Sequence, residues 1–237
     1  TVQPGRGFVS SGRGSAETLK NEDADALAKV SGISAISPEY QQRFQIVSGT
    51  GNNTNSLVIG AVPAYETVRN VSVSEGSFIT EQHLRSLGRV VVLGATVAKD
   101  LFGEESPLGK SLRINRVIFK VIGLMEAKGS SGFFNADDMA IVPLTTMQKI
   151  LSGADHLSLI AVSVTKKDDM PMVQSEASSL LAARHRVTIE NPDFSIVSQA
   201  EIVGALTQVT DTFTIFLASI AGISLLVGGI GIMNMML

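Results

Sequence analysis

An apolar run at the end of the sequence, Phe213 to Leu237, constrains the fold more than any other feature, because it contains no charged side chain. A helix rises about 1.5 Å per residue, so the run is long enough to cross a hydrocarbon core about 30 Å thick. We predict a transmembrane helix over 213–237. The alternative is a buried core helix, but such helices rarely stay uncharged over so many residues.

Small residues recur at four-residue spacing within this run, and small side chains let helices approach closely in lipid. Asn234, the strongly polar side chain of the run, either hydrogen-bonds across a helix interface or lies near the far membrane surface. The residues expected to pack in the membrane are Gly222, Gly228, Gly229, Gly231 and Asn234.

The charges before the run predict its orientation. No Lys or Arg occurs between Val187 and Leu237, whereas Glu190, Asp193, Glu201 and Asp211 precede the span. Cytoplasmic flanks are enriched in Lys and Arg, so this flank is of the opposite kind. Residues 1–212 are therefore predicted to be extracytoplasmic.

The helix is predicted to begin before the membrane, because Ser198 and Glu201 have the spacing of a capping box. Apolar residues then alternate in steps of four and three, as in a coiled-coil seam. A continuous helix over 199–237 would be about 58 Å long, roughly 28 Å more than the bilayer core needs. The alternative is a break near Gly204. The predicted stalk is 199–212, with its coupling seam at Ile202, Leu206, Val209 and Phe213.

The remaining sequence has mixed α and β patterns. We predict strands at 43–47, 57–62, 89–93, 111–114, 117–124, 157–164 and 194–197, and helices at 21–30, 95–102, 145–151 and 171–184. The order strand–helix–strand at both ends brackets a middle that is richer in strands. The predicted fold class is α+β: a βαβ-type subdomain formed by 1–71 and 146–198, with an inserted smaller β-rich subdomain at 72–145.

Catalytic and nucleic-acid-binding patterns are weak. The sequence has no Cys and a net charge of −3, with its 19 Lys and Arg residues spread along the chain, so a thiolate site and a basic footprint for nucleic acid are both excluded. His83, His156 and His185 lack metal-ligand spacing, and we interpret each as a surface or packing residue. No catalytic, cofactor-binding or metal-binding residue is predicted.

Three short segments could suggest binding sites. Gly103–Ser111 resembles a phosphate loop, but it has five residues between its glycines where the motif needs four, and it opens into a predicted strand. Asp137-Asp138 lacks the spaced acidic ladder of a calcium site and is interpreted as a turn. Phe133-Phe134 is either core packing or an exposed partner contact.

Several motifs occur together in an order that identifies a family. They are Ser34-Ala35-Ile36-Ser37-Pro38, Val58-Ile59-Gly60 with Pro63 and Tyr65, Glu75-Gly76-Ser77-Phe78, Val91-Val92-Leu93-Gly94, Leu101-Phe102-Gly103, Pro107-Leu108-Gly109-Lys110, Phe119-Lys120-Val121-Ile122-Gly123, and Asp137-Asp138-Met139 with Ile141-Val142-Pro143-Leu144. In this order they resemble the MacB-like periplasmic core domain. The closing Gly228–Asn234 resembles the start of an FtsX-like permease region, whereas the Gly/Ser-rich 5–15 matches little.

The resemblance implies a porter-like subdomain with an insert, within a permease subunit of an ABC transporter of the bacterial plasma membrane. It implies a dimer whose stalks transmit ATP-driven closure to the outer domains, with ATP and Mg bound by a partner ATPase domain or subunit. It leaves open whether a membrane-fusion adaptor and an outer-membrane channel take part. On this resemblance the chain is a fragment and not itself an enzyme. An extracytoplasmic ligand-sensing domain of a receptor is the alternative.

Overall fold

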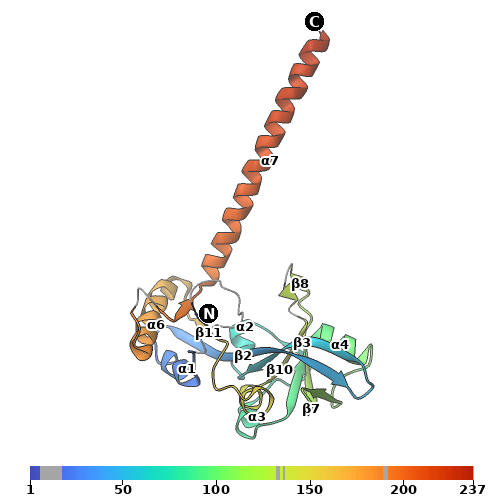
Figure 1. Ribbon diagram of the computed structural model, residues 1–237, viewed down its shortest axis with the longest axis vertical. Coiled ribbons are helices and arrows are strands. Elements are labelled where there is room, and N and C mark those ends of the chain that lie inside the picture. The colour runs from blue at the N-terminus through green and yellow to red at the C-terminus, as the bar shows by residue number, and fades with distance from the viewer. Residues whose placement is uncertain (6–17, 132–133, 136, 189–191, 237) are drawn as a thin grey trace. The chain divides into compact units, whose positions relative to one another are not determined.

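The computed structural model describes residues 1–5, 18–131, 134–135, 137–188 and 192–236, and the chain divides into two units, Thr1–Ile196 and Val197–Leu237. Figure 1 shows the first unit as a sheet with short helices and the second as one long helix. Strands and helices both occur throughout the first unit, so the predicted α+β class is confirmed.

A 10-stranded mixed sheet forms the frame of the first unit. Its strands are β1 (Val2–Pro4), β2 (Ile33–Ser48), β3 (Asn53–Ala61), β4 (Val73–Gly76), β5 (Val90–Leu93), β6 (Ser111–Ile114), β7 (Val117–Met125), β10 (Met139–Pro143), β11 (Leu159–Val164) and β12 (Phe194–Ile196). The order is β12-β1-β11-β2-β3-β10-β5-β7-β4, and β6 pairs with both β2 and β7. β8 (Ser130–Ser131) and β9 (Phe134–Asn135) form a separate ladder.

Strand β2 belongs to both halves of the sheet because it is 16 residues long. Its first part pairs with β11 as far as Glu39, and its second part pairs with β3 from Tyr40 onward. The prediction of a strand beginning at residue 43 is therefore wrong. Pro38 and Glu39 break the apolar alternation in the sequence, yet both lie in the ladder, with Pro38 opposite Ile160.

The second part of β2 closes a ring of strands, the barrel, in the order β2-β3-β10-β5-β7-β6 and back to β2. Buried and exposed residues alternate along β6 and β7, as in strands with one face against a core. The inward residues of the barrel form one apolar cluster with α4 (Ala95–Phe102) and with the π-helix η1 (Met147–Ser152).

Two helices cover the other half of the sheet, α1 (Asn21–Leu27) and α6 (Met170–His185). In α6 the buried residues Val173, Ala177 and Leu181 recur every four positions and so lie on one helix face. They pack in one cluster with residues of β1, β11 and β12. This second core is separate from the barrel cluster, although the two share Tyr40 at their edges.

The remaining helices are α2 (Tyr65–Arg69), α3 (Glu81–Arg85), α5 (Leu144–Thr146) and the 3-10 helix η2 (Lys167–Asp169). The other predicted strands and all the predicted helices of the first unit are confirmed, with ends that differ by a few residues. The structure adds α2, α3, β4 and β10, which were not predicted. β10 pairs with β3, so the sheet continues across the predicted subdomain boundary at 71/72. The division into two subdomains stays a prediction.

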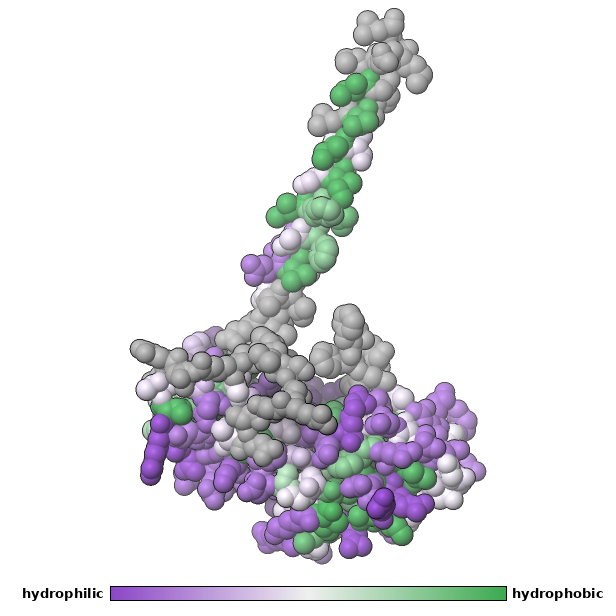
Figure 2. Space-filling model, in the orientation of Figure 1, coloured by the Kyte–Doolittle hydropathy of each residue, from purple (hydrophilic) through white to green (hydrophobic). Residues whose placement is uncertain are grey.

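The second unit is α7 (Gln199–Met236), a single helix of 38 residues that runs through Gly204 without a break, about 57 Å long. The prediction of one continuous helix is confirmed. Its segment Thr207–Leu225 is long and apolar enough to cross a membrane by length and composition, and it overlaps the predicted span 213–237. On the described part of this helix hydrophobic residues predominate after a hydrophilic start (Figure 2), and Leu225 is 78% exposed.

Candidate functional site: the anchor of the last strand

The last strand of the first unit, β12, connects that unit to α7 in the chain. Within the described ranges it pairs only with β1, in an antiparallel ladder at the sheet edge, from Pro4↔Phe194 to Val2↔Ile196. One further backbone bond, from Gly5 N to Asp193 O at 2.7 Å, extends this ladder. A ladder of three residue pairs is short, so other contacts must contribute to the attachment of β12.

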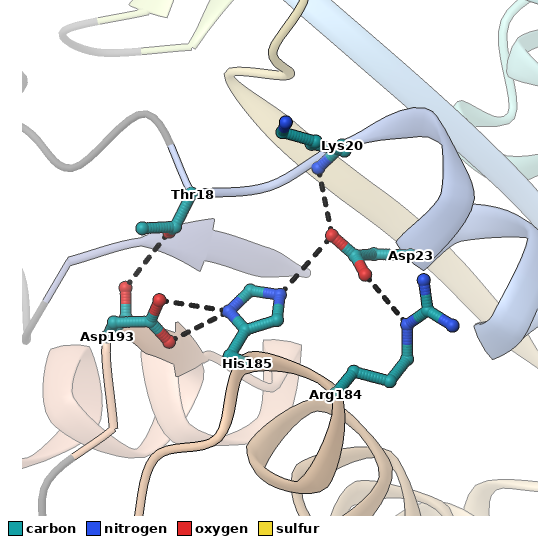
Figure 3. Close-up of polar contacts among 6 residues, drawn as sticks. All are labelled: Thr18, Lys20, Asp23, Arg184, His185 and Asp193. Atoms are coloured by element: carbon teal, nitrogen blue, oxygen red, sulfur yellow. Dashed lines mark hydrogen bonds and ion pairs between the residues drawn. The ribbon is translucent and has the colours of Figure 1, made fainter.

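A polar cluster lies directly before β12 (Figure 3). We call it the anchor cluster; its members are Thr18, Lys20, Asp23, Arg184, His185 and Asp193. His185 is the last residue of α6, and Arg186 adopts a left-handed conformation (φ 57°) that ends the helix. Asp193 precedes β12, and Asp23 lies in the first turn of α1. The cluster therefore joins three segments that are distant in the sequence.

Both ring nitrogens of His185 face carboxylates. Nδ1 lies 2.9 Å from each carboxylate oxygen of Asp193, and Nε2 lies 3.3 Å from Oδ2 of Asp23. A carboxylate oxygen only accepts hydrogen bonds, so each ring nitrogen faces an acceptor. The ring is 9% exposed and packs edge-on against Phe194 of β12 at a centroid distance of 5.9 Å.

Asp23 receives donors from three directions. The Lys20 backbone N–H donates to Oδ2 at 2.9 Å, and Arg184 Nε donates to Oδ1 at 2.9 Å. Burial alone raises the pKa of Asp23, but the hydrogen bonds from Lys20, Arg184 and His185 and the charge of His185 outweigh it, so the pKa is lowered. Asp23 is therefore a buried anion that is stabilised by its partners.

The anchor cluster is a set of hydrogen bonds and ion pairs that connects the segment before β12 to α1 and α6. With a carboxylate at each nitrogen, His185 has no ring nitrogen left to act as a general base on a substrate. Thr18 donates its hydroxyl to the backbone oxygen of Asp193 at 3.3 Å, which adds a contact to the segment before β12. Across the described ranges, no group of three or more His, Cys, Asp or Glu residues could hold a metal ion.

The other two histidines have local structural contacts. His83 accepts the Thr80 backbone N–H through Nδ1 at 3.2 Å in the first turn of α3, and the ring of His156 packs edge-on against Tyr40. The interpretation of His83 and His156 as surface or packing residues agrees with these contacts. For His185 it was incomplete, because sequence spacing cannot show that Asp23 and Asp193 meet around the ring.

The predicted stalk and membrane residues all lie on α7. Val209 and Phe213 are exposed, and nothing lies within 4 Å of a Cβ built on Gly222. The side chains of Ile202, Leu206, Gly228, Gly229, Gly231 and Asn234 lie outside the described residues, as does that of Glu201 in the predicted capping box. Val209 and Phe213 are four residues apart and so share one helix face. These roles stay predictions.

The two loops that resembled ligand sites have structural roles. Gly103–Ser111 runs from the end of α4 into β6, where Lys110 pairs with Glu105 and lies 5.1 Å from the Phe102 ring centroid. Asp137 lies in a turn before β10 and accepts the backbone N–H groups of Lys128 and Gly129, each at 2.9 Å. The interpretations as a strand-entering loop and a turn are confirmed. Phe133 and the side chain of Phe134 lie outside the described residues.

A buried ion pair has no predicted counterpart. Glu39, with 0% side-chain exposure, accepts two hydrogen bonds from Arg69 of α2, at 2.8 and 3.0 Å, and a third from Gln41 Nε2 at 2.9 Å. Burial lowers the pKa of Arg69, but its hydrogen bonds and its attraction to Glu39 outweigh this and raise it. The pair lies where β2 changes partner from β11 to β3. The sequence predicts no strand at Glu39, so it gives no signal for this pair.

The MacB-like periplasmic core domain and its relatives match most of this chain. The model of that domain matches residues 1–180. The macrolide export ATP-binding/permease protein MacB of Bdellovibrio bacteriovorus is 39% identical over 222 residues, which cover 93% of this chain and 33% of that protein. The protein of the same name from Wolinella succinogenes is 41% identical, over 93% of this chain and 34% of that protein. The chain belongs to the MacB-like periplasmic core domain family. It spans about a third of the length of these relatives.

Solved structures of the family support the fold. The periplasmic region of MacB from Actinobacillus actinomycetemcomitans superposes with a TM-score of 0.75 at 23% identity, over 87% of this chain and 91% of that one. The extracellular domain of the transporter YknZ from Gram-positive bacteria superposes with a TM-score of 0.68 at 19% identity, over 83% and 98%. At these identities the likeness concerns the fold alone.

Close backbone contacts explain two of the glycines in the MacB-like motifs. A Cβ on Gly94, between β5 and α4, would lie 2.2 Å from the backbone oxygen of Asp137. Gly76 has a φ of +86°, and a Cβ there would lie 2.2 Å from the backbone oxygen of Ile122. A side chain at either position requires the backbone to move, so these motif residues are required by packing of the sheet-rich unit.

Proposed function

We propose that this MacB-like chain is the extracytoplasmic domain and one membrane-crossing helix of an ABC transporter permease of the bacterial plasma membrane. In this role it passes motion between cytosolic ATP hydrolysis and the export or release of a substrate on the outer side. The observation that carries the proposal is the single unbroken α7, joined in the chain to the anchored strand β12. The names of the relatives, which combine ATP binding with a permease, support it.

The length of α7 suits both parts of this role. The candidate span Thr207–Leu225 is 19 residues, or about 28 Å, close to the thickness of a hydrocarbon core. A continuous helix has no flexible joint, so displacement at one end reaches the other. The anchor cluster and the β1–β12 ladder then transfer that displacement into the sheet.

The proposal assigns no chemical step to the chain. ATP and Mg would be bound by a partner ATPase domain or subunit, and the second permease protomer would supply the paired stalk. A membrane-fusion adaptor and an outer-membrane channel are further possible partners. Val209 and Phe213, with Ile202 and Leu206, form the proposed stalk seam, and Gly222, Gly228, Gly229, Gly231 and Asn234 the proposed membrane contacts.

A disulfide between paired stalks tests the proposal. The chain has no Cys, so Val209→Cys in the complete transporter adds a single thiol per copy of this segment. If Val209 lies on the seam, oxidation should link two copies and stop transport, and reduction should restore it. Gln208→Cys is the matched control, because Gln208 is one residue away and off the seam. Normal transport with fully linked stalks would contradict the proposal.

A further inference from the structure

An exposed cationic surface lies on the outside of the barrel. On β6 and β7 the inward residues fill the apolar core, and the outward residues that are exposed are Ser111, Arg113, Ile118 and Lys120. The register places Arg113 opposite Ile118 and Ser111 opposite Lys120. No Asp or Glu occurs between Glu105 and Glu126 in the sequence. We call this surface, with Arg116 at the hairpin turn, the cationic face.

The charges of the cationic face have no ion-pair partner among the residues that the structure describes. None of Arg113, Arg116 and Lys120 forms an ion pair with a carboxylate of the described residues. All three are exposed, and Arg113 and Lys120 lie on paired strands, so their charges lie close together on an open sheet surface. An open sheet surface of this kind matches a macromolecule better than a small anion, which requires convergent donors.

An apolar side chain lies among these charges. Ile118 is 63% exposed, and Met172 is the other large hydrophobic residue this exposed among the described residues of the first unit. A single isoleucine is too small an apolar area to insert into a bilayer. In a protein interface, however, an apolar contact is surrounded by a polar, solvent-accessible rim, and Ile118 among the charged residues has this arrangement.

The hairpin turn contains a residue that its conformation disfavours. Ile114 pairs with Val117, so the turn has two residues, Asn115 and Arg116, with φ values of 44° and 69°. Two positive φ values define a turn that favours Asn-Gly, and Arg at the second position is strained. A glycine in place of Arg116 would serve the fold alone better. The cation at this position therefore has no explanation in the stability of the barrel.

We propose that the cationic face is a docking site for an acidic surface of a partner protein, with Ile118 as its apolar contact. Arg113, Arg116 and Lys120 supply the complementary charge, which speeds association and fixes the orientation of the partner. The inference concerns a surface of the first unit alone and does not depend on the proposed transport role.

The first experiment finds the partner. A photo-crosslinking amino acid replaces Ile118 in the complete membrane protein in cells, and mass spectrometry maps the linked segment. Met172, similarly exposed on α6, is the control position. The proposal expects a link from position 118 to a protein segment rich in Asp and Glu, and no link to that segment from position 172. Linkage only to lipid, to no protein, or to a segment without excess acidic residues would overturn it.

The second experiment tests the chemistry with that segment as a synthetic peptide and the 237-residue chain in detergent. Arg113→Glu with Lys120→Glu should weaken binding at least about tenfold, and Lys substitutions at the peptide carboxylates should restore binding to this variant. Arg116→Gly should raise the melting temperature by about 2–4 °C and yet weaken binding several-fold. Binding unchanged by the charge reversals, or by Arg116→Gly in a chain it stabilises, would overturn the proposal.

Discussion

The two units place similar apolar side chains in opposite environments. In Thr1–Ile196 the large apolar residues fill closed clusters, and Ile118 and Met172 stand out as exposed. In α7 the described apolar residues from Val209 to Ile230 are exposed. The first unit therefore has its own core and can be stable in water, whereas α7 needs lipid or another helix to cover it. Sequence hydropathy locates both apolar regions, but only the structure shows that the apolar side chains of the first unit are buried within that unit.

Charges in α7 should have the largest effect. Ile220→Asp with Ile223→Asp places two carboxylates in the candidate span, at a cost of about 2.5–3.5 kcal/mol each near the bilayer centre. The double variant should be released from membranes by alkaline extraction, whereas the parent chain should resist. Gln45→Asp with Asn55→Asp, on exposed strand positions of the first unit, is the control and should leave extraction unchanged. A double variant that remains integral would contradict a membrane role for α7.

Loss of Arg69 should have the next largest effect, and it concerns the stability of the first unit, Thr1–Ile196. Arg69→Met leaves Glu39 buried without its cation, which typically costs about 3–5 kcal/mol. The free energy of unfolding from urea titration should fall by that amount. Arg43→Met, which removes an exposed arginine of β2, should change it by less than about 0.5 kcal/mol. A loss below about 1 kcal/mol for Arg69→Met would show that the pair does not hold β2 to α2.

Loss of His185 should have a moderate and local effect. His185→Ala removes the ring that contacts both Asp23 and Asp193, so both carboxylates lose a hydrogen-bond partner, at a cost of about 1–3 kcal/mol. Amide hydrogen exchange should accelerate in β12 before it does in the barrel. His83→Ala, which removes a helix-cap contact remote from β12, is the control. Unchanged exchange in β12 would mean that the anchor cluster does not hold the strand.

A fall in pH should have the smallest effect, a loss of the stability that ionised Asp23 contributes to the anchor cluster. The folded pKa of Asp23 is lowered, so its contribution to stability is full above its unfolded pKa of about 3.9 and is lost as pH falls through the folded value. Between pH 5 and pH 2 the parent should therefore lose more stability than Asp23→Asn, which cannot titrate there. Equal losses in calorimetry would contradict the pKa assignment.

Sequence patterns predict elements with a clear period but not contacts between distant segments. The strands at 111–114 and 117–124 follow from alternation, and α7 follows from length and apolarity. The first part of β2 was not predicted, because Pro38 and Glu39 interrupt the apolar alternation. Arg69, which neutralises Glu39, is 30 residues away in the sequence. His185 meets Asp23 across 162 residues. The anchor cluster therefore depends on the fold, whereas the stalk seam depends on local spacing alone.

In the proposed role α7 moves the sheet-rich unit through β12, and a flexible insertion tests this coupling most directly. Gly-Ser-Gly-Ser is inserted between Val197 and Ser198 in the complete transporter, and ATP hydrolysis and export are measured together. The same insertion between Gly49 and Thr50, in the exposed β2–β3 turn, is the control. We predict that the first insertion leaves ATP hydrolysis but abolishes export, and that the control retains both. Export at the parent rate with the first insertion would contradict the account.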